Sequence, residues 1–220
     1  FINASRGTLT TGTPVFGGSG SLDAFRVTAG QINIDGAGLN ALGADRLDIL
    51  ALAVQVNAVI WANNLNIVTG ANQIDYATLG TQTIAGQGAQ PGIGLDVAAL
   101  GGMYAGKITL VGTEAGVGVN QQGVIAATGD FTVTQTGQII LAGSTSAGAA
   151  MTLATQDSVT NTGVTSSCSH LNLSAQNISN TGTLAAGVDE QGQSQGNANL
   201  IVQASAALTG DGVFQATGSQ

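Results

Sequence analysis

Apolar residues recur at a fixed step of 20 in the second half of the chain, and within each step they alternate with polar residues. The successive apolar pairs are Phe131/Val133, Met151/Leu153 and Leu171/Leu173. Alternation of this kind is the period of a strand with one buried face and not that of a helix. A repeat of about twenty residues indicates a repeat architecture. We therefore predict coils made of short strands joined by turns.

A single unit of this kind cannot bury its apolar face, so it must stack on its neighbours. Strands separated by a whole coil run parallel to each other. The predicted fold class is therefore all-β, in the form of a β-solenoid. The pair after Leu171/Leu173 is Leu200/Val202, which is 29 residues further on, and the extra residues fall in the polar stretch 188–197. We predict a solvated loop there.

The tripeptide Asn-Thr-Gly occurs at Asn161 and again at Asn180, 19 residues later. We predict that these two asparagines lie one above the other and hydrogen-bond along the stack, since rungs are ~4.8 Å apart. The glycine that follows each of them is expected to occupy a left-handed turn. The alternative is that Asn-Thr-Gly is simply a favoured turn sequence.

The segment 45–68 is the most hydrophobic part of the chain. Leu47 and Leu65 are 18 residues apart, as are Ile49 and Ile67, and this spacing is close to the later period. The solenoid is therefore expected to run through this segment as strands. A helix from Asp45 to Val56 is the competing interpretation, because the segment is rich in helix-forming residues.

The period is lost between Thr69 and Gly106, where the chain becomes rich in Gly and Gln around Pro91. An interruption in a repeat array maps to an excursion on one face of the stack. We predict an extra-helical loop or hairpin here, with Pro91 at a turn or an edge, as a plausible contact surface. From 1 to 40, short strand candidates alternate with turn clusters, and Asp35-Gly36 is expected to form a corner of a coil.

The composition of the chain excludes several classes of function. Charged residues make up 7% of the chain, against a typical ~25%, and the net charge is −8 with only four Lys and Arg. Nucleic-acid binding needs clustered Lys and Arg and is therefore excluded, and anionic lipid surfaces are disfavoured. The apolar runs are far shorter than the ~20 residues of a membrane span, so no stable membrane insertion is expected.

The sequence contains few residues that could support catalysis. Cys168 is the only cysteine, so it forms no intrachain disulfide; it shares a strand face with His170, but no third group orients the pair. We expect Cys168 to fill a turn or core position. The acids Asp130, Asp157, Asp189 and Asp211 do not share one repeat phase, as a glycan-cleaving centre would require. No catalytic, cofactor-binding or metal-binding residues are predicted, and the chain is not expected to be an enzyme.

The aromatic residues have simple expected roles. Trp61 follows Ile60 and is predicted to belong to the core, although it is also a candidate binding residue. Tyr104 lies among glycines and is expected to cap an end or stack under a loop.

The segment 101–119, GGMYAGKITLVGTEAGVGV, resembles the amino-terminal secretion domain of two-partner-secretion exoproteins, the filamentous haemagglutinin family of Gram-negative bacteria. FINASRGTLTTGTP at the start, the segment 57–72 and the repeats after Val124 fit the same family, so the resemblance covers essentially the whole chain. The residues that we assign to the family motif are Gly101, Gly102, Met103, Tyr104, Gly106, Lys107, Gly112, Thr113, Glu114 and Gly116. Lys107 and Glu114 either form an ion pair or are solvated separately.

The resemblance implies a right-handed parallel β-helix with extra-helical hairpins, recognised by an outer-membrane partner transporter and templating the folding of a long shaft. It implies secretion through the periplasm and outer membrane to the cell surface, in an adhesin or a contact-dependent growth inhibition toxin with a host or neighbouring-cell receptor. Residues 1–122 would complete the secretion domain, and 123–220 would be the first shaft repeats.

One feature of the family is missing from this sequence, which contains no Asn-Pro pair. By position, the Asn-Pro motifs of the family would precede Phe1, so we expect this chain alone to lack part of the transporter signal. A carbohydrate-active or carbohydrate-binding β-helix protein is the alternative function.

Overall fold

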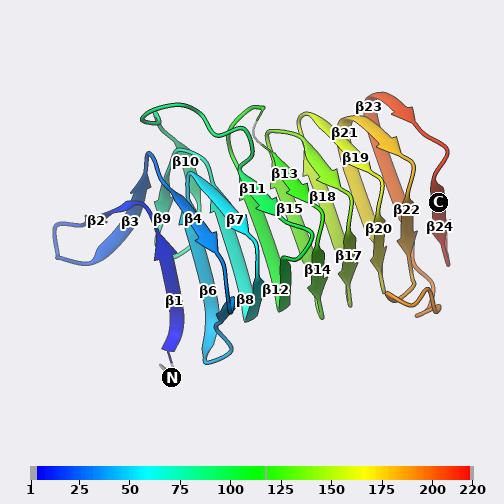
Figure 1. Ribbon diagram of the computed structural model, residues 1–220, viewed down its shortest axis with the longest axis horizontal. Coiled ribbons are helices and arrows are strands. Elements are labelled where there is room, and N and C mark those ends of the chain that lie inside the picture. The colour runs from blue at the N-terminus through cyan, green and yellow to red at the C-terminus, as the bar shows by residue number, and fades with distance from the viewer. Residues whose placement is uncertain (1–3, 117, 219–220) are drawn as a thin grey trace.

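Strands stack along one axis into an elongated coil in the computed structural model, which describes residues 4–116 and 118–218 (Figure 1). The described residues form no helix, and hence none that could cross a membrane. Most strands belong to one large sheet whose pairings are parallel, each between neighbouring coils. The parallel β-helix expected from the sequence is confirmed.

Each complete coil contributes one strand to each of three sides, which we name A, B and C. Side A contains β4 (Gln31–Ile34), β7 (Ala53–Val56), β11 (Leu95–Val97), β13 (Val119–Gln121), β16 (Ile139–Leu141), β19 (Ser158–Asn161) and the second halves of β21 (Leu171–Asn180) and β23 (Leu200–Thr209). Side B contains β5 (Leu39–Asn40), the first parts of β8 (Val59–Thr69) and β12 (Gly102–Gly112), then β14 (Val124–Ala127), β17 (Ser144–Ala147), β20 (Val164–Ser167), β22 (Thr183–Ala186) and β24 (Val213–Ala216). Side C contains β1 (Ala4–Thr10), β6 (Ala44–Ala51), the second parts of β8 and β12, then β15 (Phe131–Gln135), β18 (Met151–Thr155) and the first halves of β21 and β23.

The strand register follows the apolar period. On side C, Phe131 pairs with Met151, which pairs with Leu171, which pairs with Leu200. Nearer the N-terminus, Leu47 pairs with Leu65 at the predicted offset of 18. Inward side chains such as these are almost fully buried and form one continuous core along the axis. Like residues therefore lie in columns, as repeat spacing predicts.

A second, smaller core lies outside the coil. The strands β2 (Thr13–Phe16), β3 (Leu22–Val27), β9 (Asn72–Asp75) and β10 (Thr81–Thr83) form an antiparallel sheet in the order β10-β9-β3-β2. Its Phe25, Val27 and Ile74 pack against Leu50 and Val68 on the outer face of side C. We call this four-stranded unit the extra-helical sheet.

The extra-helical sheet explains why the segment 45–56 looks helical in sequence. Both faces of β6 are buried, because Leu47 and Ile49 face the main core while Leu50 faces the second core. A strand covered on both faces reads as a continuous apolar run. The competing helix is wrong, since β6 and β7 occupy this segment.

The excursion predicted between 69 and 106 consists of two strands and a loop. β9 and β10 belong to the extra-helical sheet, and the loop 84–94 follows them, whereas β11 and β12 already pair with the coils on either side. The hairpin β2–β3 supplies the other half of the sheet and leaves the coil much earlier, between β1 and β4. The sequence did not separate this hairpin from coil strands. Asp35-Gly36 lies in the turn between β4 and β5, as predicted.

Glycines stack at the corner between sides A and B. A Cβ on Gly163 would collide with the carbonyl oxygen of Gly143, and one on Gly182 would collide with that of Gly163. Neither Gly163 nor Gly182 is among the residues with positive φ, so the predicted left-handed turn is wrong. Glycine is required there because successive corners approach each other too closely for a side chain.

Candidate recognition surface

The second half of the family motif lies at the base of the extra-helical sheet. The first part of the motif runs along side B and the second along side C, since β12 spans both sides and pairs with β8 throughout. Thr113 and Glu114 follow β12 directly, beside the point where the chain leaves the coil after β8. Both side chains contact the first residues after β8, where the chain leaves the coil.

The two motif side chains hold the exit in place. Thr113 Oγ1 donates a hydrogen bond to Asn72 Oδ1 (2.9 Å), and the Ala71 N–H donates one to Glu114 Oε1 (2.7 Å). Gly70, with φ of 106°, allows this close approach, because a Cβ there would meet both side chains. The second half of the motif therefore fastens the excursion to the coil.

Of the two alternatives for Lys107 and Glu114, the ion pair is not formed. Within residues 4–116 and 118–218, both ion pairs end on Asp48 instead. Lys107 lies on the exposed outer face of side C, in register with Asn64, while Glu114 is occupied by a backbone amide. The two side chains act separately.

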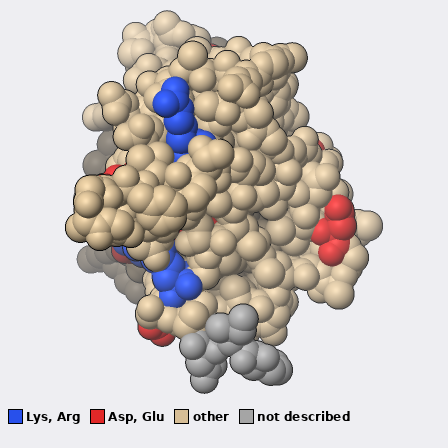
Figure 2. All heavy atoms as spheres, turned by 90° about the vertical axis from the view of Figure 1, so that its left-hand side faces the viewer, with Lys and Arg blue, Asp and Glu red and all other residues tan. Residues whose placement is uncertain are grey.

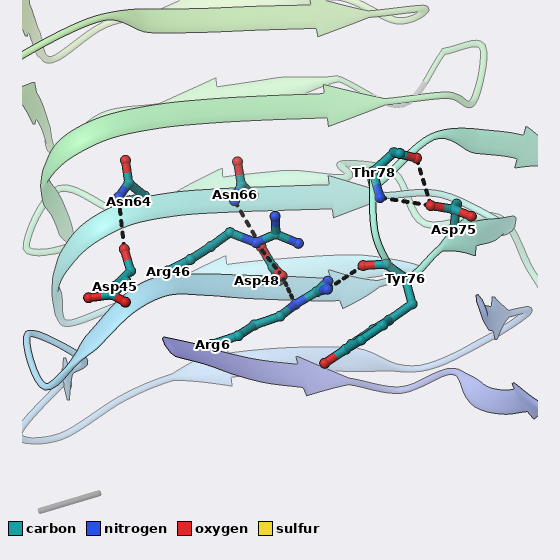
Figure 3. A network of polar contacts seen from close by, with 9 residues as sticks. All are labelled: Arg6, Asp45, Arg46, Asp48, Asn64, Asn66, Asp75, Tyr76 and Thr78. Carbon is teal, nitrogen blue, oxygen red and sulfur yellow. Dashed lines mark hydrogen bonds and ion pairs between the residues drawn. The ribbon is translucent and has the colours of Figure 1, made fainter. Parts of the chain in front are cut away.

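Asp48 is the centre of a buried polar cluster on the outer face of side C (Figure 3). Its Oδ2 lies 2.6 Å from Arg6 Nε and 3.0 Å from Arg46 Nε, and its Oδ1 accepts a hydrogen bond from Asn66 Nδ2 at 2.8 Å. Arg6 and Arg46 are paired in the β1–β6 register, so two like charges lie side by side. The carboxylate between them offsets that repulsion.

The cluster also reaches the extra-helical sheet through Tyr76, which follows β9 (Figure 3). Arg6 Nη1 donates a hydrogen bond to the Tyr76 carbonyl oxygen, and the guanidinium lies 3.9 Å from the centroid of the Tyr76 ring. The same turn is closed by Asp75, whose Oδ1 accepts hydrogen bonds from the hydroxyl and the N–H of Thr78, both at 2.7 Å. These bonds lower the pKa of Asp75. The Asp48 cluster thus joins β1, β6 and β8, which belong to three successive coils, to the extra-helical sheet.

Trp61 and Tyr104 form an exposed aromatic pair on side B. Their strands are neighbours in register, and the rings stack with centroids 4.5 Å apart at an interplanar angle of 20°. Trp61 is 45% exposed, so its predicted place in the core is wrong: Ile60 and Ala62 point inward, and the alternation turns Trp61 outward. Tyr104 neither caps an end nor lies under a loop, but stacks on Trp61.

Asn161 and Asn180 lie in one inward-facing column of side A. Asn161 Nδ2 donates a hydrogen bond to Asn180 Oδ1 at 2.8 Å, and both side chains are fully buried. Asn180 Nδ2 in turn donates to the carbonyl oxygen of Val213 in the following coil. These amides therefore also satisfy backbone groups at the glycine corners.

Cys168 and His170 lie in the bend between β20 and β21, so the shared strand face expected for them is wrong. Burial, with the charges of Asp189 and Glu190, raises the pKa of the Cys168 thiol and so disfavours the nucleophilic thiolate. His170 Nδ1 accepts the N–H of Asn199 and thereby joins two coils.

The four candidate aspartates lie in separate places. Asp130 accepts the N–H of Ala150, while Asp189 accepts hydrogen bonds from glutamines of its own loop. Asp157 lies between β18 and β19, and Asp211 lies between β23 and β24. In the part of the chain that the structure describes, no three His, Cys, Asp or Glu side chains are placed to hold a metal ion.

Open grooves adjoin the motif and the extra-helical sheet. One of about 370 Å³ lies between residues 83–90 of the excursion and the motif residues Thr113 and Glu114. Seen from the end that carries β1–β3, the surface is mostly uncharged, with only small separate groups of Lys and Arg or of Asp and Glu (Figure 2). A partner approaching this end would meet neutral polar and apolar groups.

A parallel β-helix with an antiparallel sheet on its flank defines the class of fold to which this chain belongs. The crystal structure of the filamentous haemagglutinin secretion domain superposes with a TM-score of 0.56 over 98% of this chain and 60% of that chain, at 24% identity, and so has the same fold. The family model of the TPS secretion domain matches residues 1–141. The chain belongs to this family.

Three of the relatives carry nuclease or toxin names. The tRNA nuclease CdiA-2 of Burkholderia pseudomallei (strain 1026b) is 51% identical over 148 residues, which are 67% of this chain and 5% of that protein. The toxin CdiA of Yersinia pestis is 46% identical over 166 residues, 74% of this chain and 5% of that protein. The 16S rRNA endonuclease CdiA of Enterobacter cloacae subsp. cloacae is 41% identical over 141 residues, 64% of this chain and 4% of that protein. The chain thus spans about one twentieth of the length of these relatives.

Proposed function

We propose that this chain directs the export of a much larger exoprotein, by presenting its β-helix to an outer-membrane partner transporter. The match of residues 1–141 to the TPS secretion domain carries the proposal. The geometry supports it, because the first coils, the motif and the extra-helical sheet are fastened together into one unit by Thr113, Glu114 and the Asp48 cluster.

The second part of the proposal is that the chain templates the folding of a shaft. Each coil offers the next one a complete set of parallel strand partners and a column of apolar side chains. Leu208, on β23, is 52% exposed although its register partner Ile178 is buried, and a further coil would cover it. Pairing onto a preformed coil spares the new strand the cost of nucleation, so the stack can grow coil by coil.

The whole protein is proposed to be secreted through the periplasm and outer membrane and displayed on the cell surface, as an adhesin or a contact-dependent inhibition toxin with a receptor on another cell. The toxin names of the relatives support this role for their full lengths. We assign no nuclease or glycan chemistry to the present chain. The division into a secretion part up to residue 122 and shaft repeats from 123 remains a prediction.

Export in the presence and absence of the transporter tests the proposal. The chain is fused to a reporter, the upstream segment that carries the Asn-Pro motifs of the family is restored, and the reporter is measured outside the cell. We expect export only when the partner pore is present. Equal export with and without the pore would refute the proposal.

A further inference from the structure

The strands of side B carry no charged residue, whereas those of side A carry one, Asp96, and those of side C carry several, all in its N-terminal coils. The absence of charge holds for β5, β14, β17, β20, β22, β24 and the first parts of β8 and β12. Trp61 is 45% exposed on this side and Val164 49%, and Leu42, which follows β5, is 51% exposed. An uncharged side with exposed large apolar residues is typical of a contact surface.

The aromatic pair makes the N-terminal part of side B flat. A Cβ on Gly102 would lie 2.9 Å from Tyr104 Cε2, so the Tyr104 ring lies over this glycine, against the sheet. Trp61 stacks on the adjacent coil at the same position of the register. The pair therefore offers ring surface instead of projecting as isolated side chains.

Further along, the compact loop 188–197 lies against the same side and forms a groove with it. Asp189 and Glu190, in the loop 188–197, line a groove of about 300 Å³ together with Ala126 and Ser146 of side B. Ser166 and Ala185 also point outward, on the two following coils, yet they are only 3% and 2% exposed. Ala126 pairs in register with Tyr104, and Ser146 with Ala126, so the groove continues the outward column of the aromatic pair across the strands of side B.

The loop is held in its shape by its own hydrogen bonds. Asp189 Oδ1 accepts the N–H groups of Gln191 (3.0 Å) and Gln193 (2.8 Å), and its Oδ2 accepts Gln195 Nε2 (2.7 Å). The loop is therefore a defined wall at one end of the groove, and it carries negative charge.

We propose that the uncharged face made by Trp61, Tyr104 and the adjoining groove docks an extended segment of the partner transporter, one with apolar or aromatic side chains and an Arg or Lys directed at the loop 188–197. The inference rests on the proposed function and names the surface used. The carboxylates of the loop 188–197 favour a cation at that end, whereas the aromatic pair favours apolar or aromatic side chains at the other. Trp and Tyr are among the residues that contribute most to binding when a partner covers them.

Trp61 is the only tryptophan of the chain, so its fluorescence reports directly on this face. The probe is the purified periplasmic part of the partner transporter, titrated into the chain with the upstream segment restored. We expect the Trp61 emission to shift to shorter wavelength as the partner covers the ring. Tyr104→Ser should weaken binding at least tenfold, and Trp61→Ser, followed by calorimetry, should do the same.

Ile201→Ser is the matched control, because Ile201 is also 45% exposed but lies on side C. It should leave the affinity unchanged, and Trp61→Phe, which keeps an aromatic ring, should restore most of the binding lost in Trp61→Ser. Urea unfolding of each variant shows that the coil itself is intact. Glu190→Gln should weaken binding less than the aromatic changes and reduce its salt dependence.

The outcomes separate the two proposals. If the transporter binds and the aromatic variants bind as tightly as the unmodified chain, the docking face is wrong while the secretion role stands. If the unmodified chain does not bind the transporter at all, both the secretion role and the docking face are refuted. If Trp61 emission instead shifts with the concentration of the chain alone, and sedimentation shows a dimer, a second copy occupies the face and the inference is overturned.

Discussion

Asp48→Asn is the change that most directly tests how the first coils are held together. The Asp48 side chain is 0% exposed and lies between Arg6 and Arg46, whose side chains are 14% and 31% exposed. Asparagine keeps the shape of the side chain but removes its charge. The two arginines, which the register places side by side, would then face each other without an anion.

The magnitude follows from the burial of the group. Removing one partner of a buried ion pair costs about 3–5 kcal/mol, because an uncompensated charge is left behind. Arg46 is close enough to solvent to turn outward, so we expect the lower end, about 3 kcal/mol. With a urea m-value of about 3 kcal/mol/M, the unfolding midpoint should fall by about 1 M.

The assay is urea unfolding followed by far-ultraviolet circular dichroism. Asp96→Asn is the matched control, because Asp96 accepts one hydrogen bond, from Asn120, at a partly exposed position of side A; it should cost about 1 kcal/mol or less. Adding Arg6→Met to Asp48→Asn should recover part of the loss, since one unpaired charge is removed. Equal midpoints for Asp48→Asn and Asp96→Asn would show that the arginines need no partner and would refute the reasoning.

Three further outcomes are expected. Gly163→Ala should cost about 1–3 kcal/mol because its methyl group would meet a carbonyl oxygen of the previous corner, whereas Gly18→Ala, with no atom within 4 Å, should be neutral; equal urea midpoints would contradict the stacked corners. The thiol of Cys168, whose pKa is raised by burial and then by two nearby carboxylates, should react with iodoacetamide more slowly than a free cysteine at pH 8, and faster once those carboxylates are neutralised by mutation; an unchanged rate would argue against the loop position. The pKa of Asp75 is lowered mainly by the Thr78 side chain, so its contribution to stability is present above its unfolded-state pKa and is lost as the pH falls through the lowered value. Thr78→Val should move the pKa of Asp75 upward in a nuclear magnetic resonance titration, and no movement would exclude that bond.

The repeat was readable because one coil imposes one spacing. Leu153 and Leu173 had to pair once the coil was twenty residues long, and the same reasoning placed Leu47 beside Leu65. Asn161 and Asn180 are in register at an offset of 19, because the chain between sides C and A is one residue shorter in the second of these coils. Local alternation and a constant step were sufficient, since both are properties of neighbouring residues along the chain.

The residues that do not face the core were harder to assign from the sequence. Trp61 was placed in the core because it is large and apolar, but the strand alternation that buries Ile60 turns Trp61 to solvent. Alternation was the signal that would have found this. The corner glycines were assigned to left-handed turns from the general preference of glycine for that conformation. The structure shows instead that the stacking of one corner on the next excludes a side chain.

The sequence by itself determined the strands, their step and their inward columns, because periodicity is written in residues that are near each other in the chain. Only the tertiary structure decided that β2–β3 and β9–β10 form one sheet, that Arg6 meets Asp48 and Tyr76, and that Trp61 meets Tyr104. These contacts join segments about 40 to 70 residues apart that lie on different coils or outside the coil. No local pattern encodes such distances, since they depend on which face of the finished stack each excursion folds back to cover.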